Sequence, residues 1–387
     1  MVLASFLKPI AEGGIPLYRP DLSGNERKYV LDCIDSSWIS SNGEYVQKFE
    51  RALCEITGAP HAIVLCNGTV ALHLALHCLD IGPGDEVIVP TFTYIASVNA
   101  ITQTGARPVF AESRRSDWLI DPTKIEALVT PRTKAILPVH LYGAVCDMPA
   151  ILEIARKYRL KVIEDCAESV GATLHGRHAG VFGDIGTFSF FGNKTITSGE
   201  GGAVIAKDPE LSERLRIVKG QGQSLTRRYW HEQLGFNYRM TNVAAAIGLA
   251  QSERLPQILD RKRAIASRYR AWLSGLDITF QKPDAGVRSN EWLVSVLLSA
   301  DCDRDRLMAD MAGQLVETRP VFFCAHHMPV YADHAIAVRA PEAEAIASRG
   351  VSLPSYPTLT EADQQRVVEV FIAALTAQGF GARSTTI

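Results

Sequence analysis

Two residues with complementary chemistry stand 29 positions apart in the chain. Asp165 follows a predicted strand, and Lys194 lies in a short loop between two apolar strands. A lysine between buried strands is costly unless it is paired or chemically used, and ligands bind at the carboxyl edge of open α/β sheets, where Asp165 is expected. Pyridoxal phosphate (PLP) needs such a pair, an amine for a Schiff base and a carboxylate for the pyridinium nitrogen. The pair therefore predicts a PLP site, with a surface lysine and a helix N-cap as the alternatives.

A second set of residues precedes a predicted helix. Gly68 and Thr69 follow the apolar run 61–66 and open a helical pattern. Their backbone N–H groups and the helix dipole could therefore hold a phosphate. A simple turn with a helix N-cap is the alternative interpretation.

The segments around these residues alternate between apolar runs and helical periodicity. Strands are expected at 61–66, 86–90, 108–111, 135–139, 161–164, 186–191 and 202–206, and helices at about 70–79, 93–104, 124–129 and 148–158. Short β-rich runs separated by helices are typical of α/β units around a mostly parallel sheet.

The pattern changes after about residue 245. A long helix is expected at 243–272, followed by weaker strands at 292–298 and a final helix at 361–375. This predicts a large α/β domain with an N-terminal arm at 1–250 and a small α+β domain at 251–378. The polar segment 379–387 is expected to be a disordered tail.

Composition limits the classes of function. The chain has 387 residues and a net charge of −2, so it has no basic excess for nucleic acid, and a small-molecule partner is favoured. No apolar run of about 18 residues suggests a membrane span. The eight cysteines form no C-x-x-C pair and the start of the chain has no signal-peptide pattern, which favours a cytoplasmic protein. His73 and His77 are spaced i, i+4 but have no third ligand, so no metal is expected.

Several separate motifs resemble one family. They are Asn67–Thr69, Pro138–Gly143, Asp165–Ala172, Thr187–Lys194, Gly199–Gly202 and Gly235–Asn242. Together, over about 20–370, they are similar to the DegT/DnrJ/StrS family of nucleotide-sugar aminotransferases. Three further segments resemble the members that aminate C4 of GDP-4-keto-6-deoxymannose with glutamate: Ser37–Ser41, Lys219–Gly222 and Arg227–Trp230.

The resemblance implies a fold and a cofactor site. The fold would be the type I, aspartate-aminotransferase-like fold of PLP enzymes, with pyridoxamine phosphate as the cofactor's other form. Lys194 would be the catalytic residue and Asp165 the pyridinium partner. The other contacts implied are Gly68, Thr69 and Ser189 with the phosphate, Tyr94 on the ring, Glu168 near the ring hydroxyl and Asn237 from a neighbouring subunit.

Some of these roles have ordinary structural alternatives. Ser189 could be an inert strand serine, Tyr94 a core aromatic and Asn237 a turn residue. Glu168 stands where relatives often carry Gln, and this departure leaves its role open.

The same resemblance suggests substrate contacts and partners. The candidate contacts are Trp38, His140, Arg227, Arg228, Arg319 and His326. Arg319 could hold a glutamate carboxylate or form a structural salt bridge. Arg227 and Arg228 could bind a diphosphate or lie in a solvated loop, and Trp38 could touch substrate or fill the core. The expected partners are a nucleotide keto-sugar, glutamate or 2-oxoglutarate, and a second copy in a homodimer with shared active sites.

Other functions remain open. An aminotransferase for a dTDP- or UDP-linked 3- or 4-keto sugar would have the same motifs. A dehydratase on the same scaffold has histidine in place of the lysine, so Lys194 argues against it. A non-catalytic regulatory or binding protein would not need a buried lysine paired with Asp165.

Overall fold

Seven strands form the central sheet in the computed structural model, which describes residues 13–334 and 338–380. Their order is β1 (His61–Leu65), β9 (Gly202–Ala206), β8 (Ile185–Ser189), β5 (Lys161–Asp165), β4 (Thr133–Ile136), β2 (Glu86–Pro90) and β3 (Arg107–Ala111). β9 runs antiparallel to both neighbours, and the other pairs are parallel. The prediction of a mostly parallel sheet is confirmed, and each predicted strand lies within three residues of an observed one.

Helices connect or follow these strands, most of them with a side-chain cap at the start. They include α3 (Gly68–Cys78), α4 (Ala96–Gln103), α5 (Pro122–Ile125), α6 (Met148–Tyr158) and α7 (Pro209–Lys219). The side chain of Asn67 accepts a hydrogen bond from the amide of Val70, which fixes the start of α3. The Asp147 side chain caps α6 in the same way. β2, β5, β8 and β9 read as apolar runs because both faces of the sheet are buried.

The long helix expected at 243–272 is two helices, so that prediction is wrong in one detail. α8 (Asn242–Glu253) ends before Arg254, and α9 (Leu255–Trp272) starts anew with Pro256 in its first turn. Proline has no amide hydrogen and its ring clashes with the preceding turn, so a continuous helix would be broken at this point. α1 (Glu26–Asp35) and α2 (Glu44–Thr57) pack against α8.

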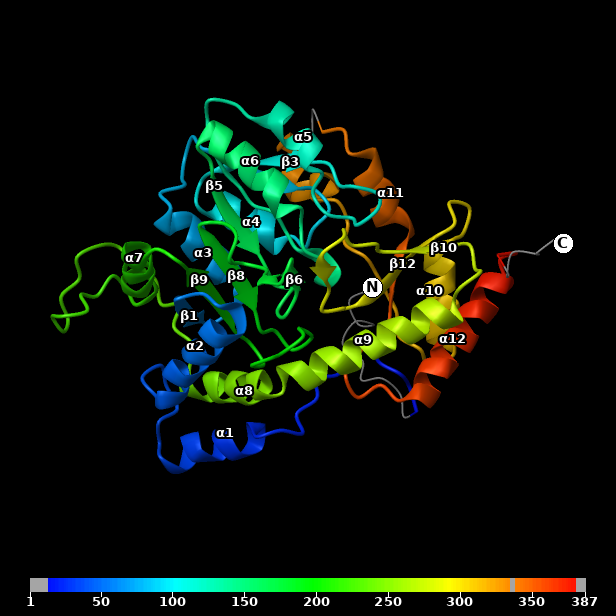
Figure 1. The fold of residues 1–387 in the computed structure, drawn as a ribbon, viewed down its shortest axis with the longest axis horizontal. Coiled ribbons are helices and arrows are strands. Elements are labelled where there is room, and N and C mark those ends of the chain that lie inside the picture. Colours follow the sequence, from blue (N-terminus) through cyan, green and yellow to red (C-terminus); the bar gives the residue numbers. More distant parts are fainter. Residues whose placement is uncertain (1–12, 335–337, 381–387) are drawn as a thin grey trace.

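A smaller antiparallel sheet lies at the far end of α9 (Figure 1). Its order is β10 (Ile278–Phe280), β12 (Val294–Leu298), β14 (Gly350–Leu353) and β13 (Arg319–Pro320). α10 (Arg304–Gly313) and α12 (Glu361–Thr376) lie beside this sheet, and α11 (Pro341–Arg349) leads into β14. A third, short sheet joins β6 (Thr173–Leu174), β7 (Arg177–His178) and β11 (Val287–Arg288).

Two buried cores accompany the two larger sheets, but segments of the chain cross between them. Ile15, near the start, packs in the core of the small sheet, and Trp292, just before β12, packs in the core of the large one. The proposed boundary at residue 250 stays a prediction, and most of the predicted tail lies outside the described residues. Within 13–334 and 338–380, no helix has both the length and the apolar character needed to cross a lipid bilayer.

Candidate active site

A cavity of about 1040 Å³ opens where the parallel strands of the large sheet end. It receives residues from the segments after β1, β2, β5 and β8 and from the lead-in to β12. Ligands in open α/β sheets bind at this carboxyl edge. The predicted residues that line the cavity are Gly68, Thr69, Tyr94, Asp165, Glu168, Ser189, Lys194 and Arg319.

Lys194 lies in the connection between the antiparallel strands β8 and β9. Its amide donates to the carbonyl of Phe191, which tightens the turn and directs the side chain into the cavity. Nζ lies 3.7 Å from Oε1 of Glu168 and 4.1 Å from the ring centroid of Trp292. The surface-lysine alternative is therefore wrong, because the amine is held between a carboxylate and an aromatic face.

Asp165 ends β5 on the floor of the cavity and is almost fully buried. Its Oδ2 accepts a 2.7 Å hydrogen bond from Ser97 Oγ, and its Oδ1 accepts one from the amide of Ala167. Both bonds fix the orientation of the carboxyl group. A buried, oriented anion at this position suits the protonated nitrogen of a heterocycle.

The start of α3 and the end of β8 meet closely enough to form a small cradle. A Cβ atom added to Gly68 would lie 2.7 Å from Cβ of Ser189, and one added to Gly202 would lie 2.3 Å from the carbonyl oxygen of Asn67. The amides of Gly68 and Thr69 stand in the first turn of α3, where no intrahelical carbonyl can bond them. These amides and the Ser189 hydroxyl fit a phosphate group.

Glu168 is the second carboxyl group of the cavity floor. Its Oε2 accepts a 2.8 Å hydrogen bond from the amide of Tyr142, and its Oε1 faces Lys194. Burial raises the pKa of Glu168 to about 7, against the opposing effects of Lys194 and the Tyr142 amide. This side chain can therefore be either a neutral acid or a carboxylate near neutral pH.

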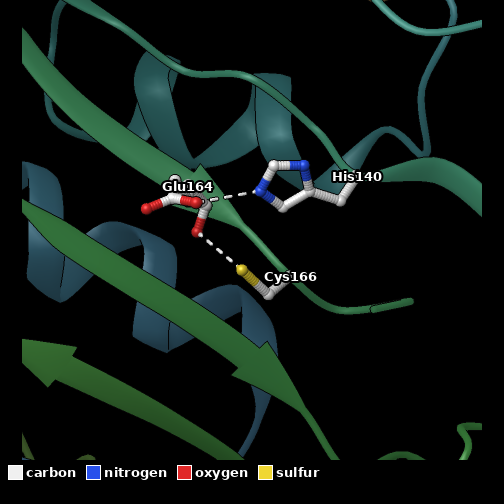
Figure 2. A group of neighbouring side chains, drawn as sticks. All are labelled: His140, Glu164 and Cys166. Atoms are coloured by element: carbon white, nitrogen blue, oxygen red, sulfur yellow. Dashed lines mark hydrogen bonds and ion pairs between the residues drawn. The ribbon is translucent and has the colours of Figure 1, made fainter. Parts of the chain in front are cut away.

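A fully buried pair lies next to the cavity floor (Figure 2). Nε2 of His140 donates to Oε2 of Glu164 over 3.0 Å, because Nδ1 accepts from the amide of Cys146 and so carries no proton. Oε1 of Glu164 accepts from the amides of Phe182 and Gly183, and Oε2 also accepts from that of Gly180.

These bonds have two consequences. Burial alone would raise the pKa of Glu164, but the hydrogen bonds from His140 and the backbone amides hold it below the usual value. His140 is 0% exposed with both ring nitrogens bonded, so the prediction that it contacts substrate is wrong. His140 instead supports Asp165, whose carbonyl accepts from the His140 amide.

His326 is also buried away from the cavity lining. Its Nδ1 lies 2.6 Å from Thr91 Oγ1 and its Nε2 lies 3.2 Å from Glu344. The prediction of a substrate contact at His326 is therefore wrong for this chain's own cavity. Burial lowers the pKa of this ring, and the neighbouring His327 adds to that effect.

The other predicted residues outside the cavity lie on the surface. Trp38 is 58% exposed, so the core-filling alternative is wrong for it. Arg227 and Arg228 lie in the loop 221–235, against the rings of Trp230 and Tyr229. Asn237 is not part of this chain's own cavity lining, although Phe236 and Tyr238 on either side are.

Arg319 lines the cavity and forms a salt bridge with Glu317 over 2.9 Å.

Several site residues were missed by the sequence analysis. Trp292 covers Lys194 and stacks on Tyr142, and Ser97 orients Asp165. Asn193 Oδ1 is buried with no hydrogen-bond partner among the described residues, next to Lys194. Tyr142 falls within a quoted motif and could have been chosen, whereas Trp292 stands 50 residues beyond the last quoted motif, with no spacing signal.

Known proteins resemble this chain over nearly its whole length. The model of the DegT/DnrJ/EryC1/StrS aminotransferase family matches residues 20–372. This chain belongs to that family. It is 50% identical to GDP-perosamine synthase of Escherichia coli O157:H7, over 89% of this chain and 94% of that protein. It is 48% identical to GDP-perosamine synthase of Caulobacter vibrioides, over 92% and 96% of the two chains.

Solved structures agree with this assignment. A Streptococcus pneumoniae protein in its PLP form superposes with a TM-score of 0.89 at 28% identity, covering 94% of this chain and 99% of its own. The chain is therefore a PLP-dependent aminotransferase of the type I fold. The residues fit the cofactor: the cradle of Gly68, Thr69 and Ser189 suits its phosphate, Asp165 its ring nitrogen and Lys194 its aldehyde carbon.

Proposed function

We propose that this chain transfers the amino group of glutamate to C4 of GDP-4-keto-6-deoxymannose and so makes GDP-perosamine. The observation that supports this choice is the identity of 48–50% to two GDP-perosamine synthases over about nine-tenths of the chain. The cavity agrees, since about 1040 Å³ exceeds what the cofactor and a small amino acid need and leaves room for a larger substrate.

The residues of the cavity floor have distinct parts in this reaction. Bound PLP supplies an electron sink and carries the amino group between the two substrates. Asp165 holds the ring nitrogen, with its own orientation fixed by Ser97. Lys194 Nζ removes the proton from Cα of glutamate and later delivers a proton to C4 of the sugar. Because Lys194 approaches from one side of the cavity, the proton arrives on one face of the sugar.

A comparison of nucleotide sugars tests the substrate. We expect kcat/KM for GDP-4-keto-6-deoxymannose to exceed that for dTDP- and UDP-linked 4-keto-6-deoxyglucose by at least tenfold, about 1.4 kcal/mol of transition-state discrimination. The product is identified by mass and NMR, and Lys194→Ala serves as the inactive control. A kcat/KM for a dTDP or UDP sugar that is tenfold higher than for the GDP sugar would contradict the GDP assignment and leave the aminotransferase assignment intact.

We also propose a homodimer in which Asn237 reaches the cofactor phosphate of the neighbouring subunit. The loop 221–235 and the segment after it project beside α7 (Figure 1) and expose large apolar side chains, Leu225, Tyr229 and Leu234, at 58%, 75% and 79%. Such exposure on one loop is typical of a protein interface. A two-fold axis would create two equal shared sites.

Mixing two inactive variants tests the shared sites. Lys194→Ala and Asn237→Ala chains, after verified subunit exchange, should regain up to about one intact site per dimer. Each variant alone, carried through the same exchange, is the control. A mixture that stays as inactive as its components would contradict shared sites, and a monomer by light scattering would contradict the dimer.

A further inference from the structure

Three consecutive residues of the β8–β9 connection are each held by a side chain from outside the large sheet. Trp292 Nε1 donates to the carbonyl of Asn193 over 2.7 Å. Tyr18 Oη donates to the carbonyl of Lys194 over 2.6 Å. Asn290 Nδ2 donates to Thr195 Oγ1 over 3.2 Å. The peptide units on both sides of the Lys194 Cα are therefore fixed by groups that lie far away in the sequence.

The residues that provide these bonds are themselves firmly held. Asn290 is 0% exposed, and its Nδ2 also lies 2.9 Å from the carbonyl oxygens of Glu168 and Val170. Its two hydrogens are shared among these three acceptors and join the two segments that carry Glu168 and Lys194. The Trp292 ring stacks on Tyr142 at 5.9 Å, and the Tyr142 amide is the one that bonds Glu168.

Tyr18 is anchored by a buried lysine with no part in the proposed chemistry. Lys262 on α9 is 1% exposed, and its Nζ lies 5.0 Å from the ring centroid of Tyr18. Nζ also donates to the carbonyl of Ser355 over 2.8 Å, and the Ser355 amide donates to the carbonyl of Leu17. Burying an amine is costly unless it is hydrogen-bonded, and here its bond to the Ser355 carbonyl fixes the chain segment that carries Tyr18.

We propose that Tyr18 and Trp292 are positioning residues that set the direction of the Lys194 side chain through the two carbonyl groups they hold. This proposal rests on Lys194 as the catalytic lysine. Nζ stands at the end of a four-carbon side chain, so a small rotation of either peptide plane displaces it by a large amount. A misplacement of about 1 Å in an active site can cost 100-fold in rate.

Two conservative substitutions test the proposal. Tyr18→Phe removes the hydroxyl and keeps the ring over Lys262, and Trp292→Phe removes the indole N–H and keeps an aromatic face toward Lys194. We expect each variant to lower kcat by about tenfold or more, with KM for the nucleotide sugar within about twofold of wild type. Tyr29→Phe and Trp272→Phe are the matched controls, because the hydroxyl of Tyr29 bonds Glu253 and Trp272 packs against the small-sheet core.

A measurement on cofactor-free protein separates positioning from general damage. After PLP is added, borohydride traps the covalent adduct at successive times, and peptide mass spectrometry quantifies it on Lys194. We expect trapping about tenfold slower in Tyr18→Phe and Trp292→Phe than in the controls, with near-UV circular dichroism unchanged. Wild-type kcat and trapping rates in both variants, or losses matched by the controls, would overturn the proposal. Absence of the adduct from Lys194 in the wild type would instead overturn the lysine assignment.

Discussion

The floor of the cavity and the loop 221–235 both carry charged side chains, but they differ in how these side chains are held. Asp165 and Glu168 are 4% and 3% exposed, and each accepts hydrogen bonds from fixed donors. In the loop, Arg228 lies on the surface and bonds only its neighbour Tyr229 among the described residues. The carboxylates of the floor are held by buried donors of one chain, whereas the two arginines of the loop contact only neighbouring aromatic residues among the residues that the structure describes.

This difference has a physical meaning. Groups aimed at a developing charge must be oriented before the reaction, because reorganisation during the reaction costs rate. Groups that bind a diphosphate can be ordered by the ligand or by a second chain, at a cost in affinity. Substitutions in the floor should therefore lower kcat, and substitutions in the loop should raise KM.

The largest effect is expected at Lys194. Lys194→Ala removes the amine that moves the proton, so kcat should fall by about 10³-fold or more. PLP should still bind noncovalently, since the phosphate cradle and Asp165 are unchanged. Steady-state rates measure the loss in kcat, and the PLP content after gel filtration measures the retained cofactor binding. Wild-type turnover in this variant would remove Lys194 from the mechanism.

Asp165→Asn should give the next largest loss. An ion pair at about 4 Å and intermediate dielectric is worth roughly 4 kcal/mol, so removing the charge should lower kcat on the order of 100- to 1000-fold. The amide oxygen can keep the bond from the Ala167 amide while the new NH2 donates to Ser97 Oγ, which limits structural damage. Ser97→Ala is the companion variant, with a smaller loss expected. A kcat within a fewfold of wild type in Asp165→Asn would show that this charge is not used.

Substitutions in the loop 221–235 should change KM more than kcat. The double variant Arg227→Ala/Arg228→Ala should raise KM for the nucleotide sugar by about tenfold and leave kcat within about twofold, because guanidinium groups contribute binding to phosphate oxygens. Arg156→Ala on α6 is a surface control of the same charge. A loss in kcat with unchanged KM would contradict the division between floor and loop.

The smallest change in kcat is expected at Glu168, and this change should depend most strongly on pH. If the neutral acid is the active form, wild-type kcat should fall as pH rises through about 7, where the pKa of Glu168 lies. Glu168→Gln should match the wild type within about threefold at pH 6.5 and remain flat to pH 8.5. A wild-type profile that rises through pH 7 and is abolished in Glu168→Gln would show that the carboxylate is the active form.

The same group also gives a stability prediction with a definite sign. The pKa of Glu168 is raised from 4.5 to about 7 in the fold, so its contribution to stability is fully present below about pH 4.5 and is lost as pH rises through about 7. Glu168→Gln should lack this slope. Thermal midpoints of the cofactor-free protein between pH 5 and 8 measure it, and parallel curves for the two proteins would contradict the raised pKa.

Much of the fold and of the cofactor floor could be predicted because their signals are local. Apolar runs of four to six residues place the strands of the large sheet, and Asp165, Ser189 and Lys194 stand at or beyond the ends of such runs. The α8–α9 break was missed, although Pro256 carries a local signal. Helical periodicity continues across the break, so the apolar pattern alone predicts one helix.

The sequence by itself determined which chemistry to expect, because Lys194, Asp165 and the helix start at Gly68 lie within motifs that resemble one aminotransferase family. Only the tertiary structure decided which side chains complete that site. Trp292 and Tyr18 reach Lys194 from 98 and 176 residues away along the chain, and the pattern at His140 did not distinguish a substrate ligand from a buried partner of Glu164. Burial and long-range hydrogen bonds are properties of the packed chain, so no local pattern specifies them.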